Sequence, residues 1–84
     1  MINSNKVKGR IVELGYTQKE AADYLGISQP TFNQKINNVR PMDVDEAERL
    51  AIFLKIADNE YGIYFFYQPV AQRNIDEAIS SLNE

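Results

Sequence analysis

The sequence contains no cysteine and no histidine. Without cysteine the chain can form no disulfide and offers no thiolate ligand to a metal. Without histidine it also lacks the usual zinc ligand and the usual general base, and no serine-type catalytic triad can be assembled. Asp and Glu remain the only obvious catalytic candidates, and no paired arrangement of them stands out. We therefore expect no metal, no cofactor and no enzymatic activity.

Long apolar runs are missing as well. No run approaches the ~18 to 20 residues of a membrane span, and the N-terminus lacks the apolar core of a signal peptide. Strand patterns are poor throughout, and there is no repeat or Gly/Ser linker. The 84 residues, 44% of them hydrophobic, fit one small domain. We expect a soluble, intracellular (cytoplasmic) all-α protein.

The net charge of −3 argues, taken alone, against a nucleic-acid partner. Its distribution is uneven, however. Residues 1–40 hold six basic and three acidic residues, whereas residues 41–84 hold three basic and nine acidic ones. This asymmetry predicts that an anionic partner meets the N-terminal half, with a randomly mixed surface as the alternative.

Helix caps divide most of the chain into short helices. Thr17 with Glu20, and Asp43 with Glu46, have the spacing of capping boxes. Ser28 can cap a helix between them. Ser4 or Asn5 can begin the first helix, Gly15 and Gly26 can end the first and second, and Asn37 or Asn38 can end the third. The expected helices span about residues 4–14, 17–25, 28–37 and 43–54, with a short fifth helix within residues 56–69.

The second and third helices are separated by almost no chain. Gly26 permits a turn that a residue with a Cβ would strain. We expect the apolar side chain of Ile27 to fill the corner between the two helices and Phe32 to anchor the following helix. Ala22, in the middle of the second helix, allows another helix to approach closely. A helix, a turn with glycine and a second helix form the helix-turn-helix arrangement, whose second helix can enter a DNA major groove.

The stretch YTQKEAADYLGISQPTFNQKINN, residues 16–38, resembles the Cro/CI-type (lambda-repressor-like, XRE) helix-turn-helix family of phage and bacterial regulators. The resemblance covers roughly residues 5–56, and it implies a five-helix domain, DNA binding, transcriptional control and usually dimerisation. We expect this domain to occupy residues 1–68. Residues 69–84 would form a C-terminal tail that contains a last helix, with its apolar stripe at Ile75, Ile79 and Leu82.

Two positions depart from the family pattern. Ile11 and Ile36 stand where the family often has an Arg–Glu ion pair, and an apolar pair can replace such a pair without loss of stability. We expect their side chains to touch. Lys35 stands where an apolar residue is usual, so the last turn of the third helix can end differently.

The outward face of the third helix carries the candidate base-reading residues. With Phe32 and Ile36 facing the core, the opposite stripe is rich in amides, which can bond the N6 and N7 atoms of adenine together. The resemblance adds Gln29, braced by Gln18, although helical spacing places Gln29 nearer the core. A merely solvated polar face is the alternative. The candidates are Gln29, Pro30, Asn33, Gln34 and Asn37.

Phosphate contacts would supply affinity rather than sequence information. The exposed amides at the start of the second helix favour an anion. A solvating role is the alternative for any single lysine. The candidates are Gln18, Thr31, Lys35, Asn38 and Arg40.

The segment YGIYFFY holds five of the nine aromatic side chains. In one interpretation Ile63, Phe65 and Phe66 cap the core as the fifth helix, and in the other an exposed aromatic patch forms a dimer surface. The candidates for either role are Tyr61, Ile63, Tyr64, Phe65, Phe66 and Tyr67.

Together these patterns predict a sequence-specific, DNA-binding transcriptional regulator of phage repressor or Cro type. Its partner would be double-stranded DNA with a pseudo-palindromic operator, bound by a homodimer. The alternative is a protein-interaction module on the same fold, such as an antirepressor or antitoxin-like protein. A basic surface around Gln18, Gln34 and Arg40 would favour DNA, and a neutral or acidic one would favour protein.

Overall fold

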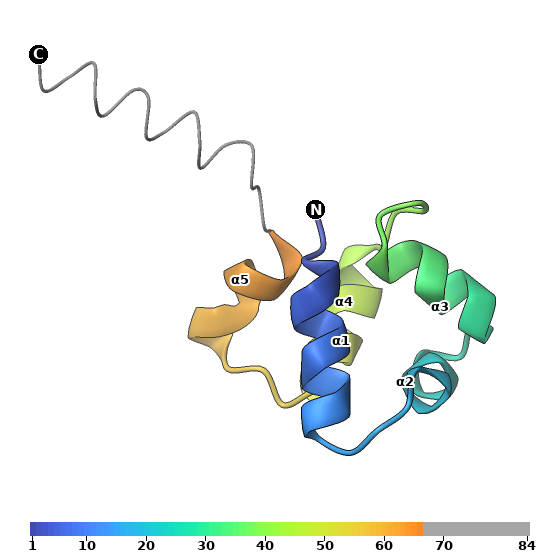
Figure 1. Ribbon diagram of the computed structural model, residues 1–84. Helices are drawn as coiled ribbons and strands as arrows, with labels where there is room; N and C mark the ends of the chain where they lie inside the picture. Colours follow the sequence, from blue (N-terminus) through green and yellow to red (C-terminus); the bar gives the residue numbers. More distant parts are fainter. Residues whose placement is uncertain (67–84) are drawn as a thin grey trace, which may run out of the picture.

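Every regular element in the part of the chain that the computed structural model describes, residues 1–66, is helical (Figure 1). This confirms the predicted all-α class and its five helices. Residues 67–84, with Tyr67 and the predicted tail helix, lie outside the described residues, so the domain boundary at residue 68 stays a prediction. The elements are α1 (Ser4–Glu13), α2 (Gln18–Leu25), α3 (Gln29–Ile36), α4 (Val44–Phe53), the 3-10 helix η1 (Asp58–Glu60) and α5 (Tyr61–Phe65).

The helices begin largely at the predicted caps. The capping box of Thr17 and Glu20 opens α2, with the Thr17 amide donating to Glu20 Oε1 at 2.9 Å and the Glu20 amide to Thr17 Oγ1 at 3.1 Å. A second capping box opens α4, and Ser28 caps α3. The first cap was predicted wrongly. Asn3, not Ser4 or Asn5, accepts the Lys6 amide at 3.2 Å, which leaves the Ser4 hydroxyl available for another contact.

A left-handed residue follows each of the first four helices, beginning with Gly15 at φ 79° after α1. Gly26 has φ 74° at the end of α2, and the Ile27 amide donates back to the Ala22 carbonyl at 3.1 Å. Asn38 has φ 63°, which confirms the predicted left-handed asparagine after α3. Lys55 has φ 54° after α4, a conformation that no residue preference predicted.

One apolar core joins all five helices. Val7, Ile11, Phe32, Ile36 and Leu50 are almost completely excluded from solvent. Burial of this kind contributes roughly 1.5–3 kcal/mol for each large side chain. The other buried residues are Ile2, Ala21, Ala22, Leu25, Ala47, Ala51, Leu54, Tyr64 and Phe65.

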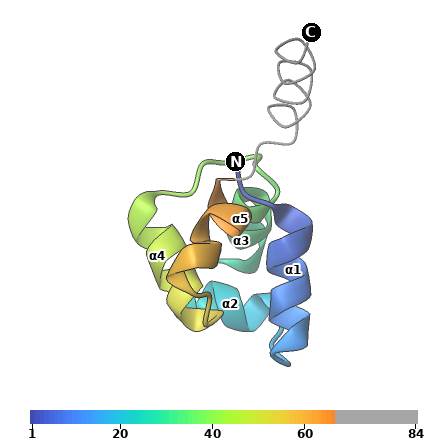
Figure 2. The ribbon, with the colours of Figure 1, turned by 90° about the vertical axis from the view of Figure 1, so that its left-hand side faces the viewer.

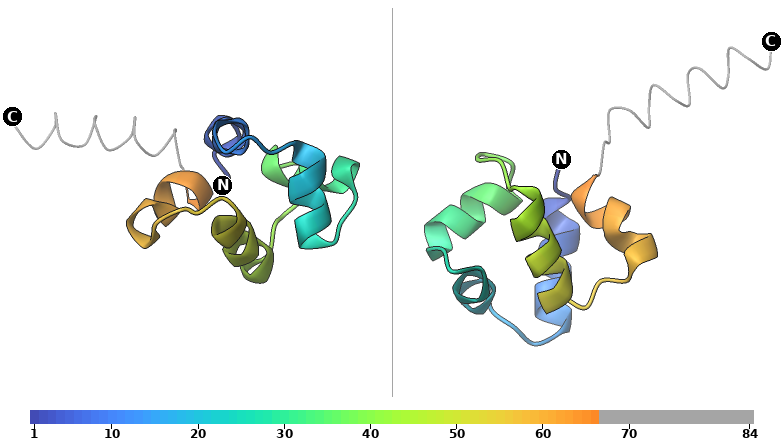
Figure 3. Two further views of the ribbon diagram at one scale, coloured as in Figure 1. Left: turned by 90° about the horizontal axis from the view of Figure 1, so that it is seen from below. Right: turned by 180° about the vertical axis from the view of Figure 1, so that it is seen from behind.

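The arrangement places α2 and α3 on one side of the molecule and α5 on the other. Seen from below and from behind, α1 and α4 lie between the α2–α3 pair and α5 (Figure 3). The side view agrees, because α5 there stands in front of α3 with α1 and α4 flanking it (Figure 2). No helix within residues 1–66 is both long and apolar enough to span a membrane.

Two arginines bind the carbonyl ends of helices, where backbone oxygens lack partners within the helix. Arg10 of α1 donates from Nε to the Leu54 carbonyl at 2.8 Å and from Nη2 to the Lys55 carbonyl at 3.2 Å. Arg49 of α4 donates to the Tyr24 carbonyl at 3.0 Å. The side-chain hydrogen bond to Glu13 raises the pKa of Arg10 above its ordinary value. These contacts give Arg10 a structural role that joins α1 to α4.

Candidate nucleic-acid interface

The α2–α3 pair presents α3 at the surface of the molecule. Only three residues separate Leu25, the end of α2, from Gln29, the start of α3. Where α3 lies in the plane of the view, α2 is seen almost end-on, so the two helices cross steeply (Figure 1). Phe32 and Ile36 of α3 are fully buried. The opposite face of α3 is therefore open to solvent, as the spacing of Phe32 and Ile36 along the helix predicted.

The structure distributes the predicted base-reading residues over this open face. Gln29, Pro30, Asn33 and Gln34 are exposed, and Asn37 is half-buried. The expectation from helical spacing that Gln29 lies nearer the core is wrong. As the first residue of α3, directly after the Ser28 cap, Gln29 projects beyond the part of the helix that packs on the core.

Four polar side chains from three helices form one continuous chain of hydrogen bonds, which we call the amide chain. The Ser4 hydroxyl of α1 donates to Asn37 Oδ1 at 2.6 Å. Asn37 Nδ2 donates to Asn33 Oδ1 at 2.8 Å, and Asn33 Nδ2 donates to Gln18 Oε1 at 3.2 Å. Gln18 therefore braces Asn33 and not Gln29, which corrects the pairing that the family resemblance implied. Ser4 was not among the predicted site residues, because it is 33 residues from Asn37.

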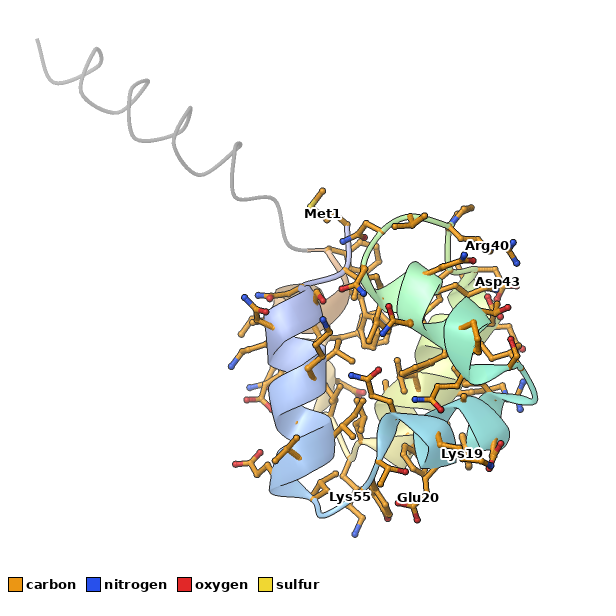
Figure 4. All side chains as sticks on the ribbon, turned by 45° about the vertical axis from the view of Figure 1, so that its right-hand side comes forward. Met1, Lys19, Glu20, Arg40, Asp43 and Lys55 are labelled. Atoms are coloured by element: carbon orange, nitrogen blue, oxygen red, sulfur yellow. The ribbon has the colours of Figure 1, made fainter. Side chains whose placement is uncertain are left out.

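Gln34 and Arg40 lie outside the amide chain. The Gln34 carbonyl accepts the Val39 amide at 2.8 Å and the Arg40 amide at 3.2 Å, so the loop after α3 folds back onto the helix. Both side chains are exposed, and Arg40 forms no ion pair within residues 1–66. Figure 4 shows Arg40 and Lys19 at opposite ends of the α2–α3 surface.

Lys35 differs from its predicted role as a phosphate contact. Its Nζ lies 2.6 Å from both carboxylate oxygens of Glu46, and the two side chains are only 13% and 12% exposed. Glu46 Oε1 also accepts the Asp43 amide in the capping box of α4. The lysine that replaces an apolar residue is thus an internal ion-pair partner that joins α3 to α4. This partner removes Lys35 from the proposed phosphate-binding set.

Asn38 is also occupied within the protein. Its Oδ1 accepts the Ile2 amide at 2.8 Å, and its Nδ2 donates to the Ile2 carbonyl at 2.9 Å. Its amide therefore holds the N-terminal segment, but the side chain is exposed and keeps one N–H donor, so its contact with a phosphate stays a prediction. Thr31 is half-buried and its Oγ1 accepts the Ser28 hydroxyl at 2.9 Å. Gln18, Thr31, Asn38 and Arg40 remain as candidates.

The surface around α3 is polar and only weakly positive. Lys19 is paired with Asp23 at 3.0 Å, and both side chains are well exposed. Residues 17–40 carry three basic and two acidic side chains, a net charge of +1. Uncharged amides therefore dominate this face. Within residues 1–66 there is no group of three acidic side chains that could hold a metal ion.

The aromatic segment is partly buried and partly exposed. Tyr64 and Phe65 are buried and belong to the core, but Ile63 is 48% exposed and Phe66 is 65% exposed. The expectation that Ile63 and Phe66 cap the core is therefore wrong. Burial raises the pKa of Tyr61, which is half-buried, above its ordinary value.

An apolar groove of about 550 Å³ runs between α4 and α5. Its lining includes Tyr61, Phe65 and Phe66 together with Val44 and Ile52, both of which are largely exposed. Figure 3 shows α5, which contributes Tyr61 and Phe65 to this lining, on the opposite side of α4 from the α2–α3 pair.

Comparison with known proteins agrees with this geometry. The family model HTH_3, described as helix-turn-helix, matches residues 8–60, which include the later part of α1 and all of α2, α3, α4 and η1. No curated protein and no solved structure matches the chain. The match spans more than half of the sequence and contains the exposed amide face of α3, the steep α2–α3 pair and the caps that set it. The chain belongs to the Cro/CI-type (XRE) helix-turn-helix family of DNA-binding transcriptional regulators.

Proposed function

We propose that the protein is a regulator of phage repressor or Cro type that reads a specific DNA sequence by placing α3 in the major groove. The observation that carries the proposal is the amide-rich face of α3, with Gln29, Asn33 and Gln34 exposed while Phe32 and Ile36 are buried. Amides that face outward from a rigid helix can donate to and accept from a base edge at the same time.

Phosphate contacts would position α3 on the duplex. Arg40 is suited to this role because it is exposed, has no ion-pair partner within residues 1–66 and follows the end of α3. Gln18 is suited because it starts α2, where unpaired backbone amides favour an anion. The small net charge of this face predicts that base contacts contribute a large share of the affinity.

We further propose that the protein acts as a homodimer in the bacterial cytoplasm and binds a pseudo-palindromic operator. The support is the apolar groove between α4 and α5, where Val44, Ile52 and Phe66 leave large apolar side chains exposed. Exposed apolar surface of this kind is typical of protein interfaces. An antirepressor-like or antitoxin-like protein would use the same groove, so DNA binding must be tested directly.

The experiment is a selection of bound sequences from a pool of random duplexes with the full chain. The proposal predicts enrichment of one motif with two inverted halves. Recovery of no motif, together with equal affinity for all duplexes, would favour the protein-interaction module. A matched control is Val12→Ala on α1, because Val12 is exposed and lies outside α3 and the groove. This variant should select the same motif as the unmodified protein.

A further inference from the structure

The amide chain has a direction. Each of its three bonds is donated by the side chain nearer to α1, so the donors run from Ser4 through Asn37 and Asn33 to the acceptor Gln18. If the Asn33 amide were rotated by half a turn, its NH₂ group would face the NH₂ group of Asn37, and its oxygen would face the oxygen of Gln18. A rotated Asn37 amide would likewise turn its oxygen toward Asn33 Oδ1. The orientations of the amides are therefore linked to each other.

The chain leaves a defined set of free hydrogen-bonding sites. An amide oxygen can accept two hydrogen bonds and an amide nitrogen can donate two. Asn33 and Asn37 each use one of each within the chain and keep one acceptor and one donor. One acceptor and one donor are what the N6 and N7 edge of adenine requires.

Ser4 terminates the chain without serving another local purpose. Asn3 caps α1, so the Ser4 hydroxyl is not needed for the helix start. Its bond to Asn37 is the shortest in the chain at 2.6 Å. Ser4 belongs to α1, whereas the other members belong to α2, to α3 or, for Asn37, to the C-cap of α3. Ser4 therefore contacts the amide side chains at α3 from α1, a helix that is not part of the helix-turn-helix pair.

We propose that Ser4 is a specificity-positioning residue, which holds the side chain of Asn37 in place and, through Asn37, that of Asn33. The two asparagines would then read DNA as one unit, whereas Gln34, which lies outside the amide chain, would read independently. This inference rests on the proposed function. It implies that base preferences at the positions read by Asn33 and Asn37 are not additive.

The test compares Ser4→Ala with Ser4→Thr, which retains a hydroxyl, and with Asn5→Ala as a matched control. Asn5 is the next residue of α1, is exposed and makes no side-chain hydrogen bond within residues 1–66. Each variant is titrated against the selected duplex and against every single base-pair substitution of it. A net hydrogen-bond contribution of the usual size corresponds to a change of about three- to tenfold in discrimination.

Ser4→Ala should lower discrimination by that factor at the same base pairs as Asn37→Ala and Asn33→Ala. Ser4→Thr and Asn5→Ala should leave the profile unchanged. Affinity for random duplex should hold in all three Ser4 and Asn5 variants, because no phosphate contact is removed. A loss of thermal stability alone would not alter the pattern of base preferences, so this readout separates positioning from a purely structural role.

A second set of variants tests whether Ser4 affects base discrimination through Asn37. In an Asn37→Ala background, Ser4→Ala should cause no further loss of discrimination, whereas in a Gln34→Ala background it should cause its full loss. Additive losses with Asn37→Ala, or an unchanged profile in Ser4→Ala, would overturn the inference and leave the proposed function standing. If the unmodified protein shows no preference among duplexes, the proposed function and the inference both fail.

Discussion

Gln34 and Arg40 are neighbours through the backbone but differ in the DNA group that each would contact. The Arg40 amide donates to the Gln34 carbonyl at 3.2 Å, which holds the two residues at the same end of α3. An uncharged amide can distinguish base edges, whereas a guanidinium next to phosphate contributes affinity for any sequence. Substitution at the two positions should therefore change the affinity for selected and scrambled duplexes in different ways.

Gln34→Ala should lose about 1–3 kcal/mol of binding free energy at the selected site and relax preference at one base pair. Affinity for scrambled duplex should hardly change, and the fold should keep its stability because the side chain is exposed. Arg40→Ala should weaken binding to selected and scrambled duplexes alike and reduce the salt slope by about one unit. Salt titrations of both variants on both duplexes measure the difference. Equal weakening by Gln34→Ala on the two duplexes, with no effect of Arg40→Ala, would show that α3 does not read bases.

At the scale of elements, α3 is held by the apolar core and by an ion pair, in addition to the amide chain. Ile36 is buried in the core that α1 supplies with Val7 and Ile11. Lys35, the preceding residue, reaches Glu46 at the start of α4. Two successive residues of α3 therefore hold it in different ways, one in the apolar core and one by an ion pair to α4, and each can be tested on its own.

Ile36→Glu should destabilise the fold by about 3–5 kcal/mol, since it places a charge at a site with no solvent exposure. We predict that the side chains of Ile11 and Ile36 lie within the ~4.5 Å of an apolar contact. Ile11→Arg should then partly restore the stability of Ile36→Glu by recreating an ion pair. The measurement is chemical denaturation of both single variants and the double variant. Losses that simply add in the double variant would show that the two positions do not interact.

Lys35→Met should destabilise the fold by about 1–3 kcal/mol, because it leaves the Glu46 carboxylate with little solvent and no cation. Adding Glu46→Gln should recover part of the loss, since glutamine removes the charge and can still accept the Asp43 amide. The salt slope of DNA binding should stay unchanged in Lys35→Met, in contrast to Arg40→Ala. A slope reduced by about one unit would instead assign Lys35 to a phosphate.

At the scale of the whole molecule, α3 and α5 lie on different sides of the α1–α4 pair, and α5 and α4 together line the apolar groove (Figure 3). A partner that covered the groove would leave the amide face of α3 open. This separation is compatible with a dimer in which both copies of α3 face DNA, at half-sites about 34 Å apart.

We predict two protein chains per duplex at saturation, measured by sedimentation. Ile52→Glu should weaken assembly on DNA without unfolding the domain, because Ile52 lines the groove and is 69% exposed. Val12→Glu introduces the same charge at an equally exposed valine of α1 outside the groove and should not change assembly. A saturated complex with one chain per duplex would contradict the dimer.

The features that could be predicted from the sequence are those set by neighbouring residues. The capping boxes of α2 and α4 each depend on two residues three positions apart, so their spacing is visible in the chain. The buried face of α3 follows from the helical period of Phe32 and Ile36. These local features, together with the glycine turn, were enough to predict the fold and the open face of α3.

Contacts between distant residues could not be predicted in this way. The bond from Ser4 to Asn37 spans 33 positions and that from Lys35 to Glu46 spans 11. Both depend on how complete helices pack, and a polar side chain on a helix surface gives no sign of the partner it will find. For this reason Lys35 and Asn38 were assigned to phosphate, although the fold gives them internal partners.

The attachment of Ile2 has a practical consequence for how the protein should be handled. Both polar groups of the Ile2 backbone bond to the Asn38 side chain, the Ile2 side chain is buried, and the Asn3 amide donates to the Tyr64 carbonyl at 2.8 Å. A purification tag fused before Met1 would therefore extend from the surface of the domain next to the C-terminal end of α3. Such a tag would stand at the edge of the surface proposed to meet DNA, and binding assays should use protein from which it has been cleaved.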